Sequence, residues 1–285
     1  DRIYRFTPSA SSPHTGTVFA SNVPGTNGLA FDWNGNLWTG DGTTGQGRVW
    51  RISPQGVPTE VFRIQPMANE VTTASGVTNV GRDVRSLPPG TITVTPTSRN
   101  ASNILGSQPL VANGVAFDHL HNLYIADTAR GALWRVHLKN DSTPEMSTGC
   151  DETFPADTLC LSHVWFANPM LEGVDGIFLD ELGNVWADAN ERNAVVYVFN
   201  FTRQAIDVFR NPVDAATQLR NAGPLETPTS PVVVGHRMCT ANSDSNRRDN
   251  FPSTGGEIGG PGEPKGKISC LDQRVTIPGM RLPVR

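Results

Sequence analysis

The stretch that decides the fold reads Asn113-Gly-Val-Ala-Phe-Asp-His-Leu-His-Asn-Leu-Tyr-Ile-Ala-Asp127. Two further copies of its pattern read Asn27-Gly-Leu-Ala-Phe-Asp-Trp-Asn-Gly-Asn-Leu-Trp38 and Asp175-Gly-Ile-Phe-Leu-Asp-Glu-Leu-Gly-Asn-Val-Trp186. Each copy places two apolar runs around a turn rich in Asp, Asn and Gly, which tolerate left-handed backbone angles. A third apolar run follows each copy after a short loop, as Arg48–Ile52 does after the first. The pattern predicts antiparallel strands in repeated units.

The spacing of the copies predicts a β-propeller. The first two copies start 86 residues apart, at Asn27 and Asn113, and one four-stranded blade takes about 40–45 residues. The length of 285 residues then corresponds to about six blades. We therefore expect one all-β domain over residues 1–285, a six-bladed β-propeller with four-stranded antiparallel blades around a central channel. Three segments do not fit the repeat and are expected to be insertions, roughly residues 64–108, 139–171 and 241–265.

The composition excludes several other classes of protein. The chain has 28 Gly and 22 Pro, only 18% charged residues and a formal net charge of −4. This balance suits short strands joined by tight turns, and it lacks the basic footprint of a nucleic-acid binder. No apolar run approaches the length that spans a bilayer. We expect a small-molecule partner, with neither nucleic acid nor membrane.

The first residue of each copy is a candidate site residue. Equivalent positions in successive blades converge on the axis, which predicts that Asn27, Asn113 and Asp175 meet at one opening of the channel. Their oxygen atoms could bind a divalent cation, their polar groups could bind an organic ligand, or they could only satisfy turn backbone. Other polar residues near the strand ends are expected to anchor turns or to be solvated: Asp41, Asp127, Asp188, His119 and His121.

One apolar run, residues 164–171, has no counterpart in the other copies. Its aromatic residues, Trp165 and Phe166, have two interpretations. They form a lid over the mouth of the channel, where they would bind substrate, or they belong to a strand that closes the insertion against the body. The sequence leaves both interpretations open.

Four cysteines and three glycosylation sequons indicate the secretory pathway. Among the three possible pairings we favour Cys150–Cys160 and Cys239–Cys270, because each would constrain a loop-rich segment. The sequons begin at Asn100, Asn140 and Asn200. The first residue is Asp1 rather than Met, as expected after removal of a leader. We expect a protein that is secreted or lies in the lumen of the secretory pathway and carries N-linked glycans.

The second and third copies resemble the regucalcin/gluconolactonase family of six-bladed propellers, on Asn113-Gly-Val-Ala-Phe-Asp118 and Asp175-Gly-Ile-Phe-Leu-Asp180. The resemblance implies that Asn113 and Asp175 bind a divalent metal, Ca²⁺ or Zn²⁺, and that Asn27 contacts substrate. The family's third ligand is a Glu on a strand before the stretch that resembles Arg2–Phe6. The sequence begins at Asp1, so that Glu is either removed with upstream sequence or absent, and two protein ligands alone would hold a metal poorly.

The cysteines, the sequons and the ending Gly266-Lys-Ile-Ser-Cys-Leu-Asp-Gln273 resemble a secreted fungal branch of this superfamily. That branch includes hetero-Diels–Alderases of tropolone meroterpenoid pathways, which join a quinone methide to a terpene alkene. The resemblance implies a reaction without metal or nucleophile, driven by an apolar channel that positions two reactants and by donors that polarise a carbonyl.

These observations lead to one first hypothesis and two alternatives. The first is a secreted, cofactor-free and metal-independent pericyclase of secondary metabolism that acts on a small, largely apolar molecule in the axial channel. Asn113 and Asp175 would be its catalytic residues, and Asn27, Trp165 and Phe166 would bind substrate. The alternatives are a lactone hydrolase that depends on Ca²⁺ or Zn²⁺, with Asn113 and Asp175 as ligands, and a non-catalytic ligand-binding propeller.

Overall fold

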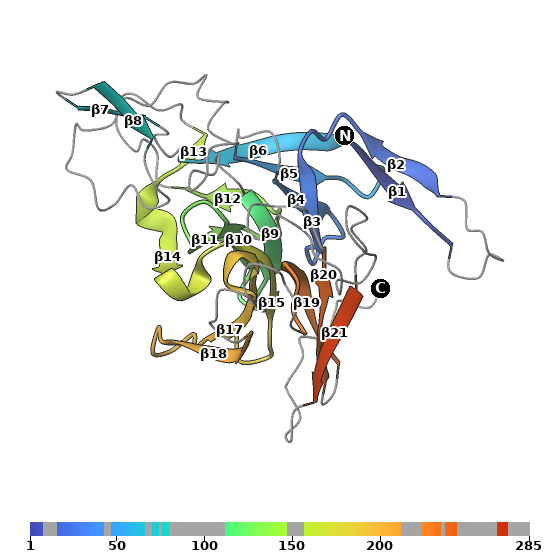
Figure 1. Ribbon diagram of the computed structural model, residues 1–285. Coiled ribbons are helices and arrows are strands. Elements are labelled where there is room, and N and C mark those ends of the chain that lie inside the picture. The colour runs from blue at the N-terminus through green and yellow to red at the C-terminus, as the bar shows by residue number, and fades with distance from the viewer. Residues whose placement is uncertain are drawn as a thin grey trace.

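The computed structural model describes residues 1–7, 16–42, 47–65, 70–73, 76–79, 112–146, 157–211, 224–234, 237–243 and 267–272. This part of the chain is built almost entirely of β-strands (Figure 1). Its helices are single 3-10 turns, namely η3 (Leu161–His163), η4 (Pro169–Leu171) and η5 (Asn190–Arg192). Among the described residues, none of the helices has the length and apolar character that crossing a membrane requires.

Three blades have the predicted four antiparallel strands. The first blade contains β3 (Thr26–Phe31), β4 (Leu37–Asp41), β5 (Arg48–Ile52) and β6 (Pro58–Ile64). The second contains β9 (Ala112–Phe117), β10 (Asn122–Asp127), β11 (Ala132–Leu138) and β12 (Pro144–Glu145). The third contains β15 (Val174–Leu179), β16 (Val185–Ala189), β17 (Ala194–Val198) and β18 (Ala205–Arg210).

The remaining described strands form smaller sheets. A fourth blade has three strands, β19 (Pro228–Val234), β20 (Arg237–Asn242) and β21 (Lys267–Asp272). Near the N-terminus β1 (Arg2–Arg5) pairs with β2 (Thr17–Ser21), and β7 (Glu70–Thr73) pairs with β8 (Gly76–Asn79). The all-β propeller is therefore confirmed, while the count of six blades stays a prediction, because the described residues show four blades.

A repeated aspartate turn connects the first two strands of each complete blade. One oxygen of Asp118 accepts the backbone N–H groups of Leu120 and Asn122 at 2.9 Å, and the other accepts the Asn122 amide at 2.7 Å. Asp32 and Asp180 do the same in their own turns. A turn of this kind satisfies its backbone locally, which explains why the Asp and Asn positions recur in the sequence.

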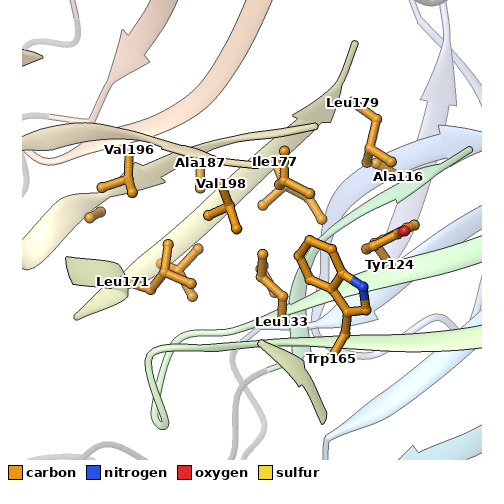
Figure 2. Packing of buried hydrophobic residues seen from close by; sticks show 14 of the residues in the cluster. Ala116, Tyr124, Leu133, Trp165, Leu171, Ile177, Leu179, Ala187, Val196 and Val198 are labelled. Atoms are coloured by element: carbon orange, nitrogen blue, oxygen red, sulfur yellow. The ribbon is translucent and has the colours of Figure 1, made fainter. Parts of the chain in front are cut away.

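The hydrophobic core lies in layers between successive sheets. The first and second blades enclose a cluster that includes Trp38, Phe62 and Trp134, all fully buried. The second and third blades enclose the cluster drawn in Figure 2, which contains Tyr124 and Leu171. Further clusters lie between the third and fourth blades and between β1–β2 and the first blade. Each blade therefore depends on its neighbours to bury both faces.

The described part of the segment 139–171 adds strands to two blades. Within it, β13 (Thr158–Leu159) pairs in parallel with β6 of the first blade. The next strand, β14 (Val164–Ala167), pairs antiparallel with the first half of β11 of the second blade, while the short strand β12 pairs with the end of β11. The parallel strand departs from the predicted all-antiparallel blades, and the segment ties the first two blades together.

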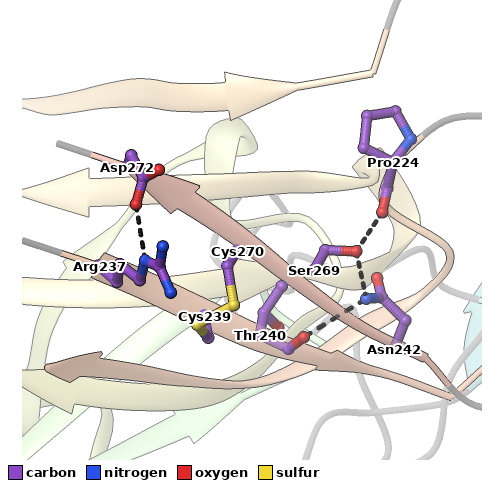
Figure 3. The surroundings of a disulfide bond; sticks show 8 residues. All are labelled: Pro224, Arg237, Cys239, Thr240, Asn242, Ser269, Cys270 and Asp272. Atoms are coloured by element: carbon purple, nitrogen blue, oxygen red, sulfur yellow. Dashed lines mark hydrogen bonds and ion pairs between the residues drawn. A yellow bond between two sulfur atoms is a disulfide. The ribbon is translucent and has the colours of Figure 1, made fainter.

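The predicted disulfide Cys239–Cys270 is confirmed, and it joins directly opposed residues of β20 and β21 (Figure 3). An ion pair between Arg237 and Asp272 lies beside it on the same two strands. Cys160 is also disulfide-bonded, whereas Cys150, its predicted partner, lies outside the described residues.

Candidate functional site

The inner strands β3, β9, β15 and β19 meet backbone to backbone at the hub. A Cβ atom built on Gly114 would lie 2.5 Å from the Asp175 carbonyl oxygen and 2.8 Å from the Gly176 Cα. A Cβ on Gly28 would lie 2.7 Å from the Gly114 Cα, and one on Gly176 would lie 2.2 Å from the Thr229 carbonyl oxygen. Only glycine permits this approach, which is why each copy carries Gly as its second residue.

This approach brings Asn113 and Asp175 together at the starts of their strands. Both side chains are buried, and the Asn113 amide donates to the Thr128 hydroxyl at 3.1 Å. That hydroxyl in turn donates at 2.6 Å to the carbonyl of Val174, the residue before Asp175. Asn27 starts the neighbouring strand β3, but it is exposed. The three predicted residues therefore lie at one end of the hub, two of them in a buried network.

A second carboxyl group, Asp188, extends this network. It is fully buried, it accepts the hydroxyl of Thr240, and its other oxygen has no hydrogen-bond partner. Burial raises the pKa of Asp188 well above its usual range, and the charge of Asp175 adds to this, while the Thr240 bond opposes it. Asn190 donates to Asp175 at 3.1 Å. Burial at this position therefore favours the protonated form of Asp188.

We predicted that the aspartates at the ends of the second strands of the copies anchor turns, and Asp127 does so. Its carboxylate accepts the guanidinium of Arg130 at 2.7 Å and the indole N–H of Trp134 at 3.0 Å. Asp188 differs from Asp127 in its position on the strand. In the second blade Asp127 pairs with Ala112 of the inner strand, whereas in the third blade the residue that pairs with the equivalent position, Val174, is Ala189. A shift of one residue turns a side chain to the opposite face of the sheet, so Asp188 faces the next blade.

The donors at this end do not match a divalent metal centre. The buried oxygens without a hydrogen-bond partner include one each on Asn113, Asp188 and Asn190. However, the strand register shows that Thr229 of β19 is equivalent to Asp175. The other two equivalent positions are Asn27 and Asn113, so the four inner strands place one carboxylate here. No group of three or more His, Cys, Asp or Glu side chains gathers anywhere in the described ranges. Ca²⁺ favours several carboxylates and Zn²⁺ favours His or Cys, so the described residues at this end do not by themselves make a complete site for either metal.

An apolar cavity of about 520 Å³ lies between the other halves of the inner strands. Its wall consists mainly of aliphatic and aromatic side chains, with Asp118, His119 and His121 as polar lining residues; the apolar lining includes Leu29, Phe31, Val115, Phe117, Ile177 and Leu179. None of Asn27, Asn113 and Asp175 lines it. The glycine contacts lie between these three residues and this cavity, so their role at a ligand channel stays a prediction.

A second, smaller cavity adjoins the first. It measures about 330 Å³ and lies between β1, β2 and β3. Leu29 and Phe31 line both cavities, and both side chains are about half exposed. The apolar surface at this end of the hub thus continues from the inner strands to the N-terminal sheet.

Sequence reasoning missed an aromatic stack at the larger cavity. The rings of Trp33 and His121 lie 3.6 Å apart with 8° between their planes, and Phe117 contacts Trp33 edge to face. His121 has a positive φ of 66°, where the other two copies carry Gly35 and Gly183. We expected a solvated turn histidine. The signal that could have found the stack is a histidine at a position that is glycine in both other copies.

Trp165 and Phe166 take the second of their two predicted interpretations, a strand that closes the segment against the body. Phe166 pairs with Leu133 of β11, and Trp165 packs edge to face on Tyr124 in the core between the second and third blades (Figure 2). The guanidinium of Arg203 covers the Trp165 ring at 4.1 Å. Neither residue lines the hub cavity, so they do not form a lid over it.

The sequons differ in accessibility. Asn140 is exposed in a turn, and its backbone carbonyl accepts the indole N–H of Trp33 at 3.2 Å. Asn200 is half-buried in the turn between β17 and β18. Asn100 lies outside the described residues.

Comparison with known proteins places the fold. No family model and no curated protein matches the chain. Regucalcin from Agrobacterium tumefaciens, described as a calcium-binding protein, matches at a TM-score of 0.52 and 16% identity over 95% of this chain and 70% of that one. Aldose sugar dehydrogenase from Streptomyces coelicolor matches at 0.47 and 13% identity, over 95% and 72%. Virginiamycin B lyase from Staphylococcus aureus matches at 0.38 and 11% identity, over 80% and 68%. The chain thus has a β-propeller fold similar to that of regucalcin.

Proposed function

We propose that this protein is a propeller enzyme that binds a small, largely apolar organic molecule in the hub cavity. The observation that carries the proposal is the cavity itself, about 520 Å³ with mostly apolar walls on the inner strands. Small-molecule sites measure about 300–1,000 Å³ and combine apolar walls with a few polar groups. The glycine contacts fix the strands that frame it, so the site is largely preformed.

The reaction that we propose is a hetero-Diels–Alder cycloaddition between a quinone methide and an alkene. One C–C bond and one C–O bond form, no group leaves, and no oxidant or reductant is needed. Such a reaction gains mainly from positioning, which can supply effective molarities of about 10⁵ M or more. The cavities that share Leu29 and Phe31 offer adjoining apolar space for two reactants. His119 and His121 would polarise the quinone methide oxygen.

The polar end of the hub takes a positioning role in this proposal. Asn113 and Asp175 lie beyond the glycine contacts and do not line the cavity. They would act by holding the starts of β9 and β15, whose other ends carry the ligand. A lactone hydrolase is the alternative; it would need a divalent metal, and the described residues alone do not form a complete metal site.

A test of the reaction uses an ortho-quinone methide that is released in situ from a stable precursor, with an excess of a terminal alkene. We expect the purified protein to give the dihydropyran in enantiomeric excess, whereas buffer alone gives the racemate. The excess should survive EDTA. Leu29→Trp should abolish it by filling the cavity, while Val57→Trp, an exchange at an exposed residue outside the cavity, should not.

Each other outcome has a defined consequence. A racemic product at the buffer rate would overturn the pericyclase proposal. Hydrolysis of glucono-δ-lactone that stops with EDTA would establish the metal-dependent hydrolase. Saturable binding of both reactants without any change in rate would establish a non-catalytic ligand-binding propeller.

We also propose that the protein works in an oxidising compartment outside the cytosol. The Cys239–Cys270 disulfide and the exposed Asn140 sequon support this. Expression with a secretory leader should yield glycosylated protein, and protein that lacks both glycans and disulfides would contradict the assignment.

A further inference from the structure

We propose that the hub cavity selects planar conjugated molecules that carry a carbonyl or phenolic oxygen, and that His121, stacked on Trp33, makes this selection. The inference rests on the proposed function, because it concerns the ligand of the same cavity. It adds the stacked pair of Trp33 and His121 as the part of the cavity wall that selects the ligand.

The first observation behind the inference is the backbone conformation of His121. The residue adopts a left-handed conformation, with φ at 66°, and the equivalent turns use Gly35 at 77° and Gly183 at 75°. Glycine takes this conformation freely, whereas a residue with a Cβ atom is strained in it. The second blade therefore has a residue with a strained backbone at a position where the other two copies have an unstrained glycine. Strain of this kind is found at functional sites.

The geometry gives the imidazole a flat aromatic partner. Trp33 and His121 come from turns of neighbouring blades, and their rings stack at 3.6 Å and 8°. The Trp33 indole N–H donates to the Asn140 carbonyl at 3.2 Å, and Phe117 lies 6.2 Å away at 87°. These contacts hold the tryptophan in place. Trp33, Phe117 and His121 all line the cavity, so its edge is a rigid aromatic wall that suits a planar ring.

The polar groups at the cavity specify an oxygen on that ring. Asp118 lines the cavity, but its oxygens already accept four hydrogen bonds, from two backbone N–H groups, the Asn122 amide and the Tyr124 hydroxyl. The imidazoles of His119 and His121 also line it, and their nitrogens are open to a ligand oxygen at a partly exposed position. The ligand therefore combines an apolar body, a planar ring and an oxygen near the histidines.

The test compares 2-naphthol with 2-methylnaphthalene, which has nearly the same shape but no oxygen. Binding is followed by the fluorescence anisotropy of each probe. We expect the wild-type protein to favour 2-naphthol by about tenfold, as one hydrogen bond supplies. His121→Gly should reduce that preference to about onefold. The melting temperature should stay equal or rise, because glycine relieves the strain.

Controls separate this inference from the proposed function. His137→Ala removes an exposed imidazole outside the cavity and should leave the preference unchanged. Suppose that both probes bind and that Leu29→Trp blocks both. If His121→Gly then keeps the tenfold preference, selection by His121 is overturned, but the ligand site is supported. If neither probe binds the wild-type protein, the ligand site falls as well. If His121→Gly does not fold, His121→Asn replaces it, since Asn tolerates positive φ.

Discussion

Removal of the Asp32 carboxylate is the perturbation whose cost the structure defines best. Asp32 is 1% exposed, and one of its oxygens accepts the indole N–H of Trp38 at 2.9 Å and the hydroxyl of Ser142 at 2.7 Å. The other accepts the backbone N–H groups of Asn34 and Asn36, both at 2.9 Å. Ser142 lies 110 residues away in sequence, so this carboxylate joins the first blade to the second.

The expected cost of Asp32→Ala follows from the donors left behind. Trp38 and Ser142 are both fully buried, and a buried donor without a partner costs about 1–3 kcal/mol. The turn N–H groups are partly accessible and can bond water, so they contribute less. We expect a total loss of about 3–5 kcal/mol, which lowers the melting temperature by about 6–20 °C in a domain of this size.

Urea unfolding, followed by tryptophan fluorescence, measures this loss. Asp141→Ala is the matched control, because Asp141 also accepts a turn N–H, from Thr143, but is fully exposed. The control should leave the urea midpoint almost unchanged. A loss of less than 1 kcal/mol for Asp32→Ala would refute the reasoning, since it would mean that the buried donors find other partners.

Three further predictions concern buried charge, the disulfide and glycosylation. Burial raises the pKa of Asp188, so the contribution of this group to folding stability is present at low pH and lost as pH rises. Asp188→Asn should therefore stabilise the folded protein by about 1 kcal/mol or more at pH 7. Measured as a urea midpoint, this gain should become smaller toward pH 4. Replacing Cys239 and Cys270 by Ser opens a link across 31 residues and should cost about 3–4 kcal/mol in calorimetry, whereas reduction of the wild type should cost more, because it also opens the disulfide of Cys160. Asn140→Gln should remove one endoglycosidase-sensitive mobility shift from secreted protein.

The three sequence copies predicted the local fold well, because their information is local. Asn113 to Asp127 specify two strands and their turn through residues at most a few positions apart, and the structure shows β9 and β10 there. The glycine after Asn113 predicted close approach at the hub, and Gly114 contacts the Asp175 backbone. The Cys239–Cys270 pairing followed from spacing within one loop-rich segment.

The features that sequence analysis missed all depend on contacts between blades. Trp33 and His121 stack across 88 positions of sequence, and no periodicity within one copy encodes that meeting. Trp165 was ambiguous because an apolar run suits a lid and a core strand equally, and only the partners Tyr124 and Arg203 decide between them. Asp188 was misassigned because it lies 13 positions after the first residue of its copy, whereas Asp41 and Asp127 lie 14 positions after theirs. Only its contact with Thr240 of the next blade shows what this difference means.

The hub links these observations, because its polar and apolar ends share the same strands. In β9, Asn113 stands at the polar end and Phe117 at the cavity, with the Gly114 contact between them. In β15 the same order runs from Asp175 to Leu179. Because both ends belong to the same strands, we expect loss of the buried network at one end to shift the cavity wall at the other. A polar residue can thus govern an apolar ligand without touching it, and the distance from Asn113 to the cavity does not argue against a functional role.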